Sequence, residues 1–79
     1  MQLSVLLFAS YAEAIGSPTV AVTLPDGATA GDVLAAVRAL VSGSRLPPAL
    51  VAVNQAYASA SRQVSDGDEV AIIPPVAGG

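Results

Sequence analysis

The stretch "EVAIIPPVAGG", residues 69–79, decides the fold that this sequence predicts. In a strand, Val70 and Ile72 point to one side, and the two residues that alternate with them point to the other. The proline pair at 74–75 then holds the chain extended, and the glycines at its end leave it slender. An apolar strand that runs directly into such an arm predicts a central strand followed by a projecting tail.

The first residues, "QLSVLLFA" at 2–9, predict a second strongly apolar strand. One of its faces is continuously apolar and consists of Leu3, Val5, Leu7 and Ala9. The other face turns from polar to apolar along the strand. Because both strands are strongly apolar, we expect the first and last strands to be parallel neighbours in the middle of a sheet.

The segments that follow the first strand show helical and extended patterns in turn. Residues 10–16 predict a short helical turn ended by its final glycine, and residues 19–24 predict a strand antiparallel to the first. Thr29, with Asp32 three residues later, predicts the start of a helix over residues 30–41. The apolar face of this helix is expected to consist of Val33, Val37, Leu40 and Val41.

The second half of the chain predicts three short strands. They are expected at 50–54, around 56–58 and at 69–74, with turns at Asn54–Gln55 and at 65–69. One main helix packed on one face of a mixed sheet of about five strands is the economical arrangement, an α+β fold. We expect residues 1–79 to form a single domain, from which residues 74–79 project as a flexible tail.

The composition argues against several classes of function. The net charge is −3 and there is no lysine, so the scattered Arg38, Arg45 and Arg62 cannot form the basic face that nucleic acids require. Without cysteine or histidine, the chain has no thiolate nucleophile, imidazole base or usual zinc site. No apolar run is long enough to span a membrane, and the first residues lack a positively charged signal region. We therefore expect a cytoplasmic protein that binds neither membranes nor nucleic acids.

Three carboxylates, Asp66, Asp68 and Glu69, are candidate ligands for a hard metal ion. The Asp-Gly-Asp pattern is more typical of a tight turn, and nothing in the sequence supplies the remaining ligands. Serines are plentiful, but no base is present to activate one. We therefore expect no metal, no bound cofactor and no catalytic residue in this chain.

The sheet face away from the main helix is expected to carry an apolar cluster. This cluster consists of Leu6, Phe8, Tyr57 and Ile73. Exposed apolar patches often mark interfaces, although scattered surface hydrophobic residues are also ordinary. Because the cluster lies at the root of the expected tail, we predict that these four residues contact a partner protein.

The C-terminal tail has two interpretations. Chain ends are ordinarily frayed, and glycine-rich ends also occur as linker remnants. Here, however, the last strand enters the tail without a polar spacer. Gly78 and Gly79 have no side chains, so the terminal carboxylate fits a narrow channel in another protein. We predict that the carboxylate of Gly79 is the functional group.

Four segments of the sequence resemble the ubiquitin-like sulfur-carrier proteins, most closely the small subunit of molybdopterin synthase, the MoaD type. They are "VLLFASYAEAIG" at 5–16, the helix that Thr29 begins, "VAVNQ" at 51–55 and "SDGDEVAIIPPVAGG" at 65–79. The pattern "DGDEVA" followed by "PPVxGG" is specific, whereas several carriers share a Gly-Gly end. The chain differs from the family at Ala12, where an arginine is common.

This resemblance implies a ubiquitin-like β-grasp fold and a role in molybdenum cofactor biosynthesis. It implies that an E1-like enzyme uses ATP to adenylate Gly79, and that a sulfur donor protein converts the adenylate to a thiocarboxylate. The small subunit then donates sulfur to cyclic pyranopterin monophosphate within a heterotetramer with the large subunit, which holds the catalytic residues. The tail residues expected in a channel of the large subunit are Pro74, Pro75, Val76, Ala77 and Gly78.

Two other functions are compatible with the same residues. A sulfur carrier for thiazole or cysteine biosynthesis, or for tRNA thiolation, has the same fold and tail chemistry but another acceptor. A ubiquitin-like interaction module, by contrast, binds partners without any covalent chemistry.

Overall fold

The two strands expected at the centre of the sheet do lie there. The computed structural model describes residues 1–41 and 46–75, and in it β1 (Gln2–Leu7) pairs in parallel with β5 (Val70–Ile73). The flanking strands are β2 (Thr19–Thr23), β3 (Leu50–Val53) and β4 (Ala56–Ala58). They complete a five-stranded sheet in the order β2-β1-β5-β3-β4, in which every pair except β1–β5 is antiparallel. The predicted mixed sheet of about five strands is confirmed.

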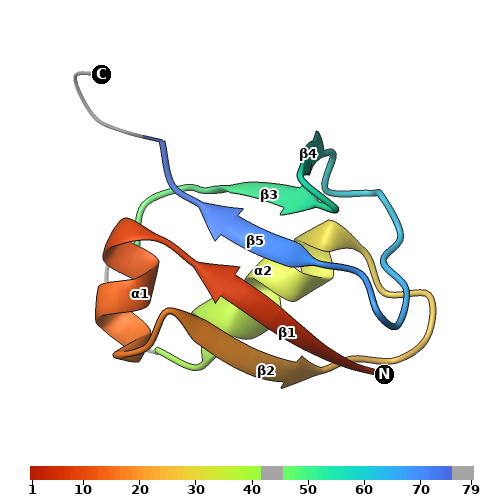
Figure 1. Cartoon of the computed structure of the whole chain (residues 1–79), viewed down its shortest axis with the longest axis horizontal. Helices are drawn as coiled ribbons and strands as arrows, with labels where there is room; N and C mark the ends of the chain where they lie inside the picture. The colour runs from red at the N-terminus through yellow and green to blue at the C-terminus, as the bar shows by residue number, and fades with distance from the viewer. Residues whose placement is uncertain (42–45, 76–79) are drawn as a thin grey trace.

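The main helix, α2 (Ala30–Ala39), covers one face of this sheet and lies behind it in Figure 1. Its first turn is held by a capping box. The Thr29 hydroxyl oxygen accepts a hydrogen bond from the Asp32 backbone N–H at 3.2 Å, and the Asp32 carboxylate accepts one from the Thr29 N–H at 2.9 Å. These two bonds satisfy backbone donors that a helix start otherwise leaves unpaired, so the predicted helix start is confirmed.

The core lies between α2 and the inner face of the sheet. The strands contribute Leu3, Val5 and Leu7 from β1, Val22 from β2, Val51 and Val53 from β3, and Val70 and Ile72 from β5. Opposite them, Val33 and Val37 of α2 are fully buried. Alternate strand residues therefore face the helix, as the period of a strand requires.

Two expectations about this core are wrong. Leu40 is 56% exposed, because α2 ends at Ala39 and Leu40 is its C-cap, with no further turn to bring it back to the sheet. Ala9 is exposed and belongs to a second helix, α1 (Ala9–Ile15), because β1 ends two residues earlier than predicted. Phe8 is extended, but Ala9 has a positive φ of 52°, which turns the chain out of the sheet.

The helix α1 extends the short helical turn predicted at 10–16. It ends at Gly16, whose φ of 84° is left-handed and whose N–H donates to the Ala12 carbonyl at 2.8 Å. A C-terminal glycine of this kind is common because it has no Cβ to clash in that conformation. Figure 1 shows α1 at the end of the molecule where β5 finishes, whereas the N-terminus lies at the opposite end.

Candidate functional site

The outer face of the sheet, away from α2, is set by the strand register. In that register Leu6 of β1 pairs with Ala71 of β5, which also pairs with Ala52 of β3. Ala52 in turn pairs with Tyr57 of β4. Paired residues point to the same side of a sheet, so one continuous row crosses the outer face from β1 to β4.

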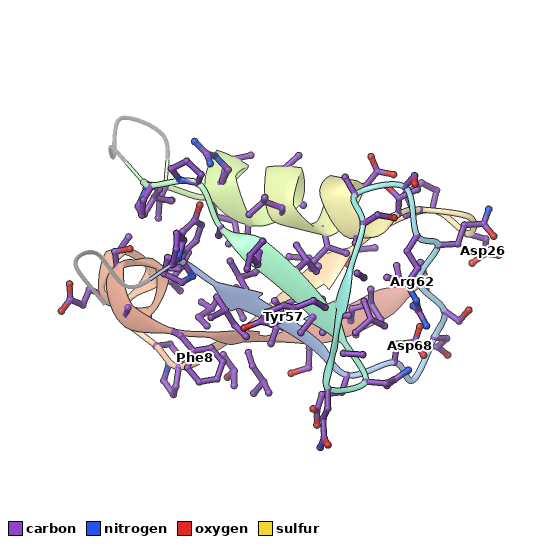
Figure 2. All side chains as sticks on the ribbon, turned by 90° about the horizontal axis from the view of Figure 1, so that it is seen from above. Phe8, Asp26, Tyr57, Arg62 and Asp68 are labelled. Atoms are coloured by element: carbon purple, nitrogen blue, oxygen red, sulfur yellow. The ribbon has the colours of Figure 1, made fainter. Side chains whose placement is uncertain are left out.

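All four residues of this row line a hollow with a volume of about 300 Å³. Its lining residues are Leu6, Phe8, Ala52, Gln55, Tyr57, Glu69, Ala71 and Ile73. All four residues of the predicted apolar cluster are among them. Phe8 is 47% exposed and Tyr57 68% exposed, and Figure 2 shows Phe8 on the side of the sheet away from α2. We call the eight lining residues the outer hollow.

Other parts of this surface were missed in the sequence. Leu50 is 51% exposed and pairs with Ile73 across β3 and β5, so it extends the apolar face toward the root of the tail. The sequence predicted a strand at 50–54 without assigning its faces, and the pairing of β3 with β5 is what brings Leu50 beside Ile73. Gln55 and Glu69 add a polar rim to the outer hollow, which no periodicity indicates.

The root of the tail leaves the sheet at this hollow. Ile73 is the last residue of β5 and is half-buried, whereas Pro74 is buried and Pro75 is exposed. The chain therefore becomes exposed at Pro75, and the backbone at 74–75 is restricted because proline fixes φ. The predicted tail residues Val76, Ala77 and Gly78, and the predicted sulfur-carrying residue Gly79, lie outside the described residues.

At the far end of β5, the acidic turn at 65–69 is held by hydrogen bonds. The Asp68 carboxylate accepts from the Ser65 backbone N–H at 2.8 Å and from the Asn54 side-chain amide at 3.1 Å. These bonds lower the pKa of Asp68, and the bond from Ser65 has the largest effect, followed by the bond from Asn54. Desolvation opposes this shift, and the positive charge of Arg62 lowers the pKa slightly further. Gly67 takes a φ of 89° in this turn.

The three candidate metal ligands therefore have different surroundings. Asp68 bonds within the turn, Glu69 lines the outer hollow and Asp66 is exposed. Within residues 1–41 and 46–75, no group of three or more acidic side chains is placed to hold a metal ion. Figure 2 shows Asp68 and Arg62 together at one end of the molecule, with Asp26 nearby and Phe8 at the other end.

Tyr11 carries a structural role that no sequence pattern indicated. It is fully buried, although it belongs to the short helix α1. Its hydroxyl donates to the Pro47 carbonyl and accepts from the Arg38 guanidinium of α2 at 3.3 Å. The tyrosine therefore links α1, α2 and the segment that leads into β3, and the exposed Arg38 supplies the link to α2.

Among the described residues, no helix is both long enough and apolar enough to cross a membrane. A model of the ThiS family matches residues 5–79. The chain belongs to the ThiS family. The predicted family resemblance is thereby confirmed over nearly the whole sequence.

Individual relatives agree with this ThiS assignment. The molybdopterin synthase sulfur carrier subunit of Dictyostelium discoideum is 37% identical over 83 residues, covering 99% of this chain and 96% of that protein. The subunit of the same name from Chlamydomonas reinhardtii is 40% identical over 83 residues and covers both chains completely. The crystal structure of SAMP1 from Haloferax volcanii, a small archaeal modifier protein, superposes with a TM-score of 0.81 at 32% identity, covering all of both chains. The predicted ubiquitin-like β-grasp fold is confirmed.

Proposed function

We propose that this chain is the sulfur carrier subunit of a molybdopterin synthase and that the Gly79 carboxylate carries the sulfur. The observation that supports this most is the similarity to sulfur carrier subunits of that enzyme, which extends over 99% and 100% of this chain. The matched region includes the specific pattern at residues 65–79. A carrier needs no catalytic group of its own, which agrees with a sequence that lacks cysteine, histidine and lysine.

In the proposed reaction, the chain is a cosubstrate of other enzymes. A carboxylate oxygen of Gly79 attacks the α-phosphorus of ATP on an E1-like enzyme, and pyrophosphate leaves. A sulfide equivalent from a donor protein then attacks the acyl carbon and displaces AMP, which leaves a thiocarboxylate. The thiocarboxylate sulfur then attacks a carbon of cyclic pyranopterin monophosphate and displaces an oxygen substituent there. Water cleaves the acyl–sulfur bond of the resulting thioester, so the sulfur stays on the pterin and Gly79 becomes a carboxylate again. This chain binds no cofactor, and ATP is consumed by the activating enzyme.

The outer hollow is the proposed contact with the large subunit of the synthase. A partner seated on it covers Leu6, Phe8, Tyr57 and Ile73, which a small protein otherwise leaves to water. Since Ile73 is both part of the hollow and the residue before the tail, the same contact aims the tail into the partner. Pro74 and Pro75 would set its direction, while Val76, Ala77 and Gly78 would line the channel. A heterotetramer of two small and two large subunits is the proposed assembly.

A mass measurement tests the sulfur-carrier proposal directly. The chain is incubated with an E1-like enzyme, ATP and a sulfur donor, and its intact mass is recorded. We expect the mass increase of one oxygen-to-sulfur exchange, and no increase for a chain that lacks Gly79. An unchanged mass, under conditions that load a known carrier, contradicts the proposal and favours a non-covalent interaction module. Incubating the thiocarboxylate form with the acceptor systems of molybdopterin, thiazole, cysteine and tRNA thiolation then identifies the pathway.

A second candidate function, modification of other proteins, is favoured by the likeness to the small archaeal modifier protein. In that case the adenylated Gly79 is attacked by an amine of a target protein, and an amide bond forms as AMP leaves. The two functions are distinguished by the product. A modifier gives conjugates with target proteins, and their amide bonds survive reducing agents and strong nucleophiles. A carrier gives a free thiocarboxylate, whose sulfur is alkylated by iodoacetamide.

A further inference from the structure

The rim of the outer hollow is chemically different from its floor. Of the eight lining residues, Gln55 and Glu69 have polar side chains, and Tyr57 adds a hydroxyl group. Glu69 is the only charged residue among these eight. Both are exposed. Protein interfaces typically have an apolar centre and a polar rim, and charges at the rim govern which partner associates and how fast. The position of Glu69 is therefore relevant to partner choice.

Glu69 is held in place by one residue of the β3–β4 turn, Asn54. The Asn54 backbone N–H donates to the Glu69 carbonyl at 2.7 Å, and the Glu69 N–H donates to the Asn54 side-chain oxygen at 3.0 Å. The Asn54 side-chain nitrogen also donates to the carboxylate of Asp68 at 3.1 Å. Asn54 therefore forms three hydrogen bonds to two consecutive residues of the turn before β5.

The same turn places Gln55 at the hollow. Asn54 and Gln55 have φ values of 52° and 70°, as a two-residue hairpin turn requires, and a glycine is common at such a second position. Glutamine is unfavourable there because its Cβ is crowded in the left-handed conformation. Residues in such sparsely populated backbone conformations cluster at functional sites. Here the strained residue carries a polar side chain to the rim, beside Glu69.

We propose that Asn54 is a positioning residue that holds Glu69 at the rim of the outer hollow, where Glu69 pairs with a cationic side chain of the large subunit. The partner surface then combines an apolar side chain, which enters the hollow, with an arginine or lysine beside it. This inference rests on the proposed function. It is supported by charge complementarity, because the carrier has a net charge of −3 and no cationic residue lines the hollow as described.

A matched pair of charge reversals tests the role of Glu69. Glu69→Arg and Asp66→Arg change the net charge equally and lie in the same turn, but only Glu69 lines the outer hollow. The affinity of each variant for the purified large subunit is measured by calorimetric titration at about 0.05 M and about 0.5 M salt. We expect Glu69→Arg to weaken binding about tenfold at low salt and less at high salt, where charges are screened. Asp66→Arg is expected to stay within about twofold of the parent.

A double-mutant cycle tests whether Asn54 acts through Glu69. Asn54→Gly removes the two side-chain hydrogen bonds while glycine still adopts a positive φ readily. We expect Asn54→Gly to weaken binding about two- to fivefold in the parent chain and to have almost no further effect in Glu69→Gln. Circular dichroism checks that each variant is folded. Should Asn54→Gly fail to fold, Asn54→Ala replaces it, because it removes the same two side-chain hydrogen bonds, to Asp68 and to the Glu69 N–H, and adds no charge.

The outcomes separate this inference from the proposed function. If the parent chain does not bind the large subunit, both are wrong. If it binds, but Glu69→Arg and Asp66→Arg have equal effects, the pairing of Glu69 with a cation is wrong while the carrier function stands. If Asn54→Gly weakens binding equally with and without the Glu69 carboxylate, Asn54 serves the fold alone and the positioning role is overturned.

Discussion

The two faces of the sheet differ in burial. On the inner face, Leu7 and Ile72 are 3% and 0% exposed under α2. On the outer face, their sequence neighbours Phe8 and Ile73 line an open hollow, and Phe8 is 47% exposed. Since all four residues are similarly apolar, the difference comes from what covers each face. The sequence of a strand specifies two apolar faces, but the fold supplies a cover for only one of them.

This difference separates the residues that stabilise the fold from those available for a partner. Burying an aliphatic or aromatic side chain contributes roughly 1.5–3 kcal/mol, and the inner face contributes that on folding. The outer face yields the same kind of free energy only when a second protein excludes water from it. A small protein that binds and releases a partner benefits from keeping these two contributions on different faces.

Phe8→Asp separates the two faces most sharply. A carboxylate in the outer hollow has to lose its hydration when a partner covers it, so we expect binding to the large subunit to be abolished. The free energy of unfolding should change by less than about 0.5 kcal/mol, as for an ordinary surface substitution. Calorimetric titration and urea denaturation measure the two effects. Ile73→Asp should also abolish binding, and unchanged affinity in both variants would exclude this face as the docking surface.

Ile72→Ala affects the other face. Ile72 is fully buried against the core, so its truncation is expected to cost about 2–5 kcal/mol. That is a large share of the total of roughly 4–12 kcal/mol expected for a domain of this size. The matched control is Leu50→Ala on the outer face, which should change stability by less than about 0.5 kcal/mol. Equal losses in urea denaturation would show that the outer face also stabilises the isolated chain.

Thr29→Ala is expected to have a smaller effect, because it removes one side-chain bond of the capping box rather than core contacts. The loss of an N-cap hydroxyl typically costs about 1 kcal/mol, and the inner face should stay intact. Thr29→Ser keeps the hydroxyl and should retain most of the parent's stability. Thermal unfolding of the parent and the two variants measures this. If Thr29→Ser loses as much stability as Thr29→Ala, the methyl group of Thr29 matters and its hydroxyl does not.

Local patterns in the sequence predicted most of this architecture. The apolar runs at both ends predicted β1 and β5 as parallel neighbours, and Thr29 with Asp32 predicted the start of α2. The alternation along β1 placed Leu6 away from the helix and beside the expected site. These features depend on residues that are close in the sequence, so a pattern of two or of three to four residues is enough to find them.

The errors and omissions depend on contacts between distant segments. The spacing of Leu40 predicts that it lies on the apolar face of the helix, but spacing does not show where the helix ends. Tyr11 is buried, and the partners of its hydroxyl, Pro47 and Arg38, are far away in sequence. Asn54 reads as an ordinary turn residue, and only the fold brings it to Asp68 and Glu69. Tertiary placement of this kind leaves no periodic signal.

Asp68, in the turn before β5, belongs to neither face and provides the smallest expected effect. Its pKa is lowered below the ordinary 3.8, first by the Ser65 N–H bond and then by the Asn54 bond, so the unfolded chain binds its proton more readily. The resulting stabilisation is complete above the ordinary pKa and is lost as pH falls through the lower folded value. We expect urea denaturation to show the parent more stable than Asp68→Asn near neutral pH, with this advantage shrinking below about pH 4. Asp66→Asn, in the same turn, is the control, and an advantage over Asp68→Asn that persists at the lowest pH would show that the carboxylate's charge does not hold the turn.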